Sequence, residues 1–290
     1  KEAATPEGDI ALQLSLGGLR GGHSGLEIAL NRGNANKMMA RLLQELCLDG
    51  AQLASWHGGN MRNAIPRDSQ AVITIQPDNE QAVRDIAAQY LADFQAELEG
   101  VESGITLDIV RTDHPATVLP EPIRDNIINA IIACHDGVLR FIPSIPSVVE
   151  TSSNLAIVNV GDGKAEVIVL ARSSNDSYMT YECNMIESAF SMAGMSVCYS
   201  GEYGAWQPNF QSQLVASIVP LYEEVTGTKA EVQVCHAGLE CSLIGAAYPG
   251  MDMVSMGPTL RSPHTPDERC HIPSVETFWR FFRTLVQSTH

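Results

Sequence analysis

The sequence predicts an α/β protein of the α+β kind, built from two domains. Residues 10–111 show strand and helix patterns in the order βαββαβ. Residues 122–200 show a similar order, and a cluster of glycine, proline and asparagine at 203–209 then interrupts the pattern. Beyond this cluster strands and helices alternate, as they do in an open α/β layer. We therefore expect one domain at 8–202 and a second at 203–290.

The first half of the N-terminal domain, about 8–112, carries the clearest periodicity. Residues 10–16 alternate between apolar and polar and predict a strand. A helix is expected at 34–48, because Met38, Met39, Leu42, Leu43 and Leu46 recur at helical spacing. The remaining elements expected here are strands at 52–56 and 71–76, a helix at 80–98 and a strand at 105–111.

The second half, about 113–202, looks similar. We expect helices at 122–135 and 179–193 and strands at 153–160, 165–171 and 196–200. Asn63-Ala64-Ile65 precedes one strand of the first half, as Asn154 to Ile157 precedes a strand of the second. This echo indicates an internal duplication. The alternative, that any two α+β units look alike at this level, stays open.

The C-terminal domain, 203–290, shows few strands. Helices are expected at 212–226 and 274–287, and strands at 231–235 and 251–256. Such a set resembles part of a larger sheet. We expect the rest of that sheet to come from sequence that this chain does not contain.

Composition excludes several classes of function. The chain has 34 acidic and 18 basic residues in 290, a net charge of −16, and no basic run. A nucleic-acid-binding surface needs clustered lysine and arginine, so nucleic acid is not an expected partner. No apolar run approaches the roughly 20 residues that span a bilayer, and residues 1–9 do not look like a signal peptide.

Seven cysteines are scattered along the chain without a CxxC pair. Most lie in apolar segments, where free cysteine packs as a small hydrophobic side chain. The pattern is typical of a reducing compartment, and we expect a cytoplasmic protein.

A histidine near the C-terminus is held in a stiff loop. His264 lies between Pro263 and Pro266, shortly after the expected strand at 251–256. Proline fixes φ and restricts the residue before it, so this loop would hold the imidazole in one place, as a metal ligand requires. The alternative is an ordinary surface or core histidine.

Two further candidates follow the strand expected at 231–235. His236 and Glu240 flank Gly238. Loops at the carboxyl ends of strands are where α/β sheets bind ligands. The alternative is an ordinary polar loop.

The N-terminal domain offers three candidates. His23 lies in a loop that contains five glycines, where an imidazole could stabilise an oxyanion; the alternative is a flexible turn. Asn63 and Arg172 lie near strand ends in the two halves. Arginine can bind a carboxylate through two hydrogen bonds, although a lone arginine is more often part of a surface ion pair.

Several catalytic signatures are absent from the sequence. There is no GxSxG elbow, no Walker A loop, no HExxH and no dinucleotide-binding GxGxxG. Cys241 has no evident base beside it, so nucleophilic catalysis has no support.

Taken together, the motifs resemble the M20 metallopeptidase family, and most of all its aminoacyl-histidine dipeptidases. The matching segments run in order across the whole chain: 21–25 with 33–37, 58–67, 149–154, 172–177, 206–208, 236–241 and 251–268. In that family a lid domain is inserted into a catalytic domain that holds two zinc ions. The resemblance therefore implies a two-part lid and a partial zinc-peptidase domain.

The resemblance also implies roles for single residues. His264 matches a zinc ligand, and His23 matches the lid histidine that polarises the scissile carbonyl. Asn63 and Arg172, and through the duplication Asn154, match residues that hold the substrate carboxylate. His236 and Glu240 would line the site. The implied substrate is a small dipeptide, such as β-alanyl-histidine, and the lid would form a homodimer.

This chain also departs from the family pattern. The other metal ligands and the glutamate base of the family lie N-terminal to the lid, and none has a match here; Ser242 stands where the closest relatives have glycine. A catalytic zinc needs about three protein ligands, so this chain alone is expected to be inactive. The sequence leaves two hypotheses: the C-terminal part of a dipeptidase that uses a metal-activated water, or a non-catalytic lid that binds and dimerises.

Overall fold

The computed structural model describes residues 3–201, 206, 209–234, 240–261 and 268–288. It divides into two compact units. Unit 1 comprises residues 1–172 and 177–200, and unit 2 comprises residues 173–176 and 201–290. The assignment of 8–202 as a lid and 203–290 as a partial catalytic domain stays a prediction.

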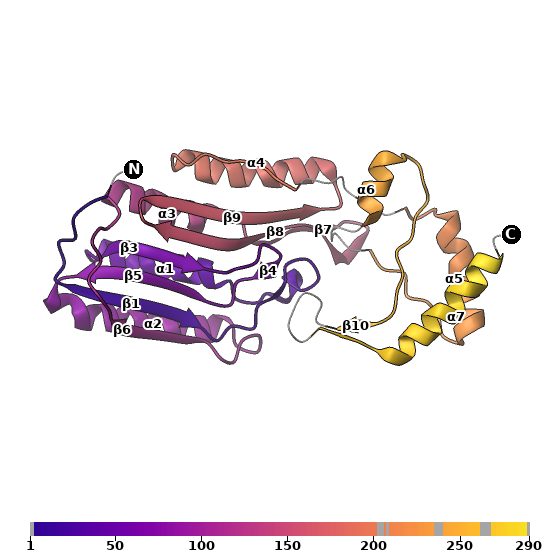
Figure 1. Ribbon diagram of the computed structural model, residues 1–290, viewed down its shortest axis with the longest axis horizontal. Coiled ribbons are helices and arrows are strands. Elements are labelled where there is room, and N and C mark those ends of the chain that lie inside the picture. Colours follow the sequence, from indigo (N-terminus) through magenta and orange to yellow (C-terminus); the bar gives the residue numbers. More distant parts are fainter. Residues whose placement is uncertain (1–2, 202–205, 207–208, 235–239, 262–267, 289–290) are drawn as a thin grey trace. The chain divides into compact units, whose positions relative to one another are not determined.

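Unit 1 is built on one seven-stranded sheet (Figure 1). The strand order is β6-β1-β5-β3-β8-β7, and β9 pairs with β8. Every pair whose register is known runs antiparallel. The strands are β1 (Ile10–Gly17), β3 (Gln52–Gly58), β5 (Ser69–Ile75), β6 (Thr106–Arg111), β7 (Gly137–Ile142), β8 (Ile145–Gly161) and β9 (Lys164–Ser173).

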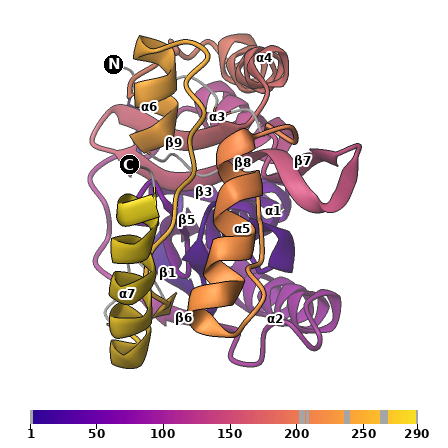
Figure 2. The same ribbon diagram turned by 90° about the vertical axis from the view of Figure 1, so that its right-hand side faces the viewer.

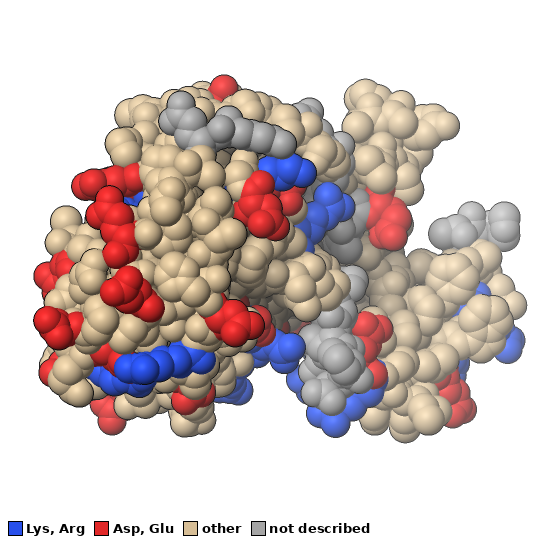
Figure 3. Space-filling model, turned by 60° about the vertical axis from the view of Figure 1, so that its left-hand side comes forward, with Lys and Arg blue, Asp and Glu red and all other residues tan. Residues whose placement is uncertain are grey.

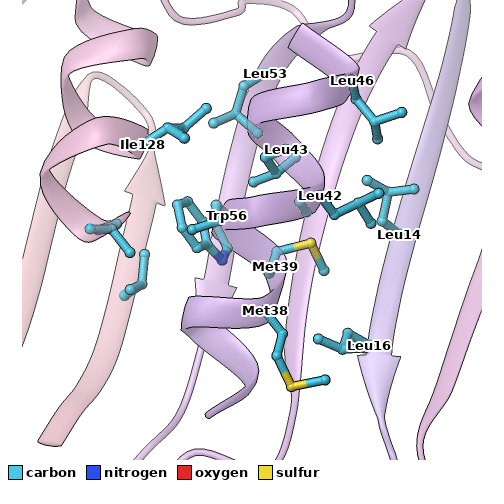
Figure 4. Packing of buried hydrophobic residues seen from close by; sticks show 14 of the residues in the cluster. Leu14, Leu16, Met38, Met39, Leu42, Leu43, Leu46, Leu53, Trp56 and Ile128 are labelled. Carbon is cyan, nitrogen blue, oxygen red and sulfur yellow. The ribbon is translucent and has the colours of Figure 1, made fainter. Parts of the chain in front are cut away.

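Four helices pack with this sheet around a single core. They are α1 (Ala35–Leu48), α2 (Glu80–Glu97), α3 (Glu121–Ala133) and α4 (Asp176–Met192). The apolar stripe of α1 presents Met39, Leu42 and Leu43 to the sheet, where Trp56 of β3 and Leu14 of β1 meet it (Figure 4). All five side chains are at most 1% exposed. The mixed α/β fold that the sequence predicts is confirmed.

The second half of unit 1 differs from the prediction at both ends. The region expected to be a strand at 196–200 forms no strand. Conversely, β7 and the first part of β8, residues 145–152, were not predicted. Residues 150–154, Glu-Thr-Ser-Ser-Asn, are polar and resemble a loop, yet all five are buried in β8. The elements of the second half, α3, β7, β8, β9 and α4, therefore follow the order αβββα, without the flanking strands of the first half.

Unit 2 is mainly helical. It contains α5 (Gln213–Thr226), α6 (Glu240–Ala247) and α7 (Ile272–Ser288), with a two-residue ribbon of β10 (Leu260–Arg261) and β11 (Arg269–Cys270). Helices α5 and α7 lie side by side (Figure 2), and the rings of Tyr222 and Phe281 meet edge to face at 5.1 Å.

Two strands predicted in unit 2 are wrong. Residues 231–234 and 251–256 form neither helix nor strand. A strand is stable only when a neighbour satisfies its backbone hydrogen bonds. In the described part of the chain no strand pairs with either segment.

Figure 3 shows acidic side chains scattered over the face drawn, with basic ones among them. Among the described residues, no helix is long and apolar enough to cross a bilayer.

Candidate functional site

The glycine-rich loop of unit 1 is tied to the segment that carries Asn63. β2 (Gly22–His23) pairs with β4 (Ala64–Ile65), which places His23 opposite Ala64. The Ser24 N–H also donates to the Asn63 carbonyl at 2.9 Å. Two candidates separated by 40 positions in the sequence thus lie close together, His23 on β2 and Asn63 in the turn that immediately precedes β4.

Gly22 is required at the start of this loop. Its φ is 146°, a conformation that L-residues rarely adopt. A Cβ at this position would overlap the guanidinium of Arg32 and would lie 2.8 Å from Oε2 of Glu27. These two side chains therefore pack directly on the glycine backbone.

The His23 ring has a defined tautomer. The backbone N–H groups of Gly25 and Leu26 donate to Nδ1 at 3.1 and 3.0 Å. Because Nδ1 accepts both bonds, the ring proton is on Nε2. His23 is only 8% exposed, so its neutral imidazole presents a single N–H donor from a largely buried position.

Arg172 reaches the same place from the end of β9. A methyl group built on Gly25 would lie 3.1 Å from Cε1 of His23 and 3.4 Å from Nε of Arg172. Both side chains therefore pack against one glycine. Arg172 is 7% exposed, and a cation held at a nearly dry site attracts carboxylates more strongly than one in water.

Asn154 joins β8 to this cluster. Its Nδ2 donates to the carbonyls of Ala64 at 2.8 Å and Arg62 at 3.3 Å, the two residues that flank Asn63. Asn154 is fully buried, whereas Asn63 is half-buried. This geometry favours Asn154 as a residue that holds Asn63 in place over one that touches a substrate itself.

A buried polar network supports β8 next to Asn154. Asp136 accepts hydrogen bonds from Nδ2 of Asn34 at 2.9 Å and from the N–H of Leu155 at 2.8 Å. Burial raises the pKa of the Asp136 carboxyl, and these two donors oppose that shift. Lys37 donates to three carbonyls at the end of α3, and burial lowers its pKa.

The other three predicted residues lie outside unit 1. Glu240 is exposed at the first position of α6. His236 and His264 lie outside the described residues. Among the residues that are described, no three His, Cys, Asp or Glu side chains group as a metal site would require.

The cluster in unit 1 is suited to binding rather than to proton abstraction. It combines the N–H of a neutral imidazole, a guanidinium and a half-buried amide. Such donors stabilise a carbonyl oxygen that gains negative charge and pair with a carboxylate. Sequence reasoning missed Glu27, Arg32 and Asp136; the only signal was a glutamate four residues after His23.

Comparison with known proteins confirms the resemblance found in the motifs. Residues 14–102 match the peptidase dimerisation domain of the M20 family. The chain is 37% identical to the cytosol non-specific dipeptidase of Escherichia coli (strain K12) over 98% of its length. It also matches the crystal structure of an aminoacylhistidine dipeptidase from Vibrio alginolyticus, with a TM-score of 0.86, 36% identity and 99% of the chain covered. In both comparisons the chain spans 59% of the relative's length.

Proposed function

Because residues 14–102 carry the dimerisation domain of the M20 peptidases, we propose that this chain is the C-terminal part of a metal-dependent dipeptidase. The observation that carries the proposal is the convergence of His23 and Arg172 on Gly25, with Asn63 in the adjacent turn before β4. These groups match the two features that every dipeptide presents, a peptide carbonyl and a terminal carboxylate.

In the proposed reaction, His23 donates its Nε2 proton in a hydrogen bond to the scissile carbonyl oxygen. The bond strengthens as that oxygen becomes an oxyanion in the tetrahedral intermediate. Arg172 and Asn63 bind the terminal carboxylate and so fix the position of the peptide bond. Asn154 keeps the Asn63 segment in place through its two backbone carbonyl contacts.

Zinc is the proposed cofactor of the intact protein, where it would polarise the carbonyl and activate a water molecule. His264 is the residue of this chain that we propose as a ligand, with His236 and Glu240 lining the site. The described residues alone do not bring a ligand set together, so the other ligands and the general base would come from the rest of the intact protein.

An exposed apolar face in unit 2 supports the proposal that the rest of the catalytic domain is supplied by another part of the intact protein. One stripe of α7 carries Ile272, Val275, Trp279, Phe282 and Val286, which are 81%, 44%, 58%, 40% and 45% exposed. Apolar surface of this extent usually marks a place that another part of a protein covers. We propose that the remainder of the catalytic domain packs there.

Within the dipeptides, the substrate class that we propose is Xaa-His, and we propose that cleavage takes place in the cytoplasm. The names of the two relatives differ on this point, since one is called non-specific and the other aminoacylhistidine dipeptidase. Turnover of β-alanyl-histidine by the intact protein, compared with dipeptides that lack histidine, separates the two. We expect a chelator to abolish hydrolysis and zinc to restore it. Failure to cleave any dipeptide would refute the proposal.

Substitution of His264 tests the proposed metal ligand. His264→Ala in the intact protein should lower both zinc content and activity. Unchanged zinc stoichiometry would refute that assignment.

A second candidate is a non-catalytic module that binds and dimerises. The match to a dimerisation domain favours it, and a homodimer formed through unit 1 is compatible with either candidate. If the natural protein has no residues that supply the missing ligands, this second candidate remains and the enzyme is excluded. Light scattering at several concentrations measures the dimer directly.

A further inference from the structure

The loop that presents His23 is closed by a glutamate four residues later. Oε2 of Glu27 accepts the backbone N–H of His23 at 2.8 Å. In return, the backbone N–H of Glu27 donates to the His23 carbonyl at 3.0 Å. This reciprocal pair fixes the backbone on both sides of the His23 Cα.

Arg32 engages the other oxygen of the same carboxylate. Its Nη2 lies 2.8 Å from Oε1 of Glu27, and its Nη1 donates to the carbonyl of Gly21. Asn31, with φ 53°, turns the chain so that Arg32 can reach back. Both carboxylate oxygens of Glu27 thus accept hydrogen bonds. We call the Glu27–Arg32 ion pair, with its bonds to His23 and Gly21, the brace; it spans the loop from Gly21 to Arg32.

We propose that Glu27, held by Arg32, is a positioning residue for the catalytic hydrogen bond of His23; this inference rests on the proposed function. The ring is oriented by the N–H groups of Gly25 and Leu26, which lie inside the segment closed by the brace. Loosening the brace moves these donors and therefore the Nε2 proton. Misplacement of a reacting group by about 1 Å can cost on the order of 100-fold in rate.

The chain offers a matched control for loss of an ion pair. Arg41 of α1 and Glu97 of α2 form two hydrogen bonds of 2.7 Å, and both side chains are about half exposed. This pair joins two helices and has no contact with the loop of residues 21–32 among its hydrogen bonds. Glu97→Ala therefore removes a surface ion pair without touching the brace.

The experiment compares Glu27→Ala, Glu27→Gln and Glu97→Ala in the intact protein, with β-alanyl-histidine as substrate. We expect Glu27→Ala to lower kcat by about tenfold, with KM and zinc content little changed. Glu27→Gln keeps an acceptor for the His23 N–H and should retain an intermediate kcat. Glu97→Ala should leave kcat within about twofold of the wild type, as expected for an exposed ion pair.

Hydrogen exchange of residues 22–27 gives a readout that does not depend on activity. Their amides should exchange faster in Glu27→Ala and at the wild-type rate in Glu97→Ala. Faster exchange with unchanged kcat, or a rise in KM and a loss of zinc with kcat unchanged, would overturn the positioning role. If the wild-type intact protein itself is inactive, the proposed function is contradicted, and this result is known before any variant is compared.

Discussion

Unit 1 and unit 2 bury their apolar side chains to very different extents. In unit 1 a single core joins β1, β3, β5, β8 and helices α1–α4. In the described part of unit 2, the buried apolar side chains are Ile218 and Phe281, while Trp279, Tyr248 and Leu243 are each at least 58% exposed. Unit 1 therefore has an extensive buried core, whereas the described part of unit 2 leaves most of its large apolar side chains exposed, as expected if the proposed remainder of the catalytic domain covers them.

This difference explains where the sequence predicted structure well. The pattern at 34–48 predicts α1 almost to the residue, because its apolar stripe is buried within unit 1. The apolar composition of residues 251–256 predicts a strand equally clearly, but these residues form none. A strand forms only where a neighbouring strand satisfies its backbone hydrogen bonds. Local pattern specifies a helix, but it specifies a strand only together with the strands beside it.

The largest effect is expected from truncation of the central tryptophan of unit 1. Trp56 is fully buried, and its Nε1 donates to Oγ of Ser69 at 2.8 Å. Trp56→Ala should lower the free energy of unfolding of unit 1 by about 3–5 kcal/mol. Urea denaturation followed by circular dichroism measures this. A loss below about 1 kcal/mol would mean that unit 1 does not depend on this core.

The buried thiols of unit 1 should resist alkylation. Burial raises the pKa of Cys47 to about 11 and that of Cys134 to about 12. At pH 8 the thiolate of Cys47 should therefore be about a hundredfold scarcer than that of an ordinary cysteine. Iodoacetamide followed by mass spectrometry should modify the exposed Cys198 and Cys270 first. Equal rates at all four sites would show that the core opens readily.

The caps of α1 and α5 offer a matched pair across the two units. Oδ1 of Asn34 accepts the N–H groups of Asn36 and Lys37, and its Nδ2 also serves the buried Asp136. Oγ of Ser212 accepts the N–H of Val215 and donates to Asp252, a carboxylate that is only half-buried. Asn34→Ala should cost about 2 kcal/mol or more, because it also removes a donor from a buried carboxylate. Ser212→Ala should cost about 1 kcal/mol, seen as faster hydrogen exchange in α5 alone.

The cost of Asn34→Ala should depend on pH. The pKa of Asp136 is raised in the folded protein, so the folded state retains that proton to higher pH than the unfolded state does. The contribution of Asp136 to stability is therefore full below about pH 4 and declines as the pH rises through its folded pKa. Loss of the Asn34 donor should accentuate this decline. A penalty that stays constant as the pH rises from about 4 through the alkaline range would contradict this role for Asp136.

The smallest effect is expected at Trp279, an exposed tryptophan of α7. Trp279 is 58% exposed, so Trp279→Ala in the 290-residue chain should change stability by less than about 0.5 kcal/mol. In the intact protein the same substitution should cost several times more if the remainder of the catalytic domain covers α7. Equal small costs in both contexts would contradict the proposed cover.

Four residues of the candidate site could be identified from the sequence. His23, Asn63, Asn154 and Arg172 were identified from glycine-rich and strand-end patterns and from resemblance, and the structure brings them together. The fixed tautomer of His23 and the Glu27–Arg32 brace could not be predicted, because they depend on how the loop folds back on itself. The part of β8 that comprises the buried Glu150, Thr151 and Ser152 was missed for the same reason, since its burial follows from contacts distant in sequence.

The most direct test of the central claim is His23→Ala in the intact protein, with kcat, KM and zinc content measured together on β-alanyl-histidine. If unit 1 supplies the hydrogen bond to the oxyanion, kcat should fall by on the order of 10²–10³. Zinc content should stay unchanged and KM should change little, because the interaction is made in the transition state. An unchanged kcat would remove His23 from the reaction, and loss of zinc would place it among the metal ligands instead.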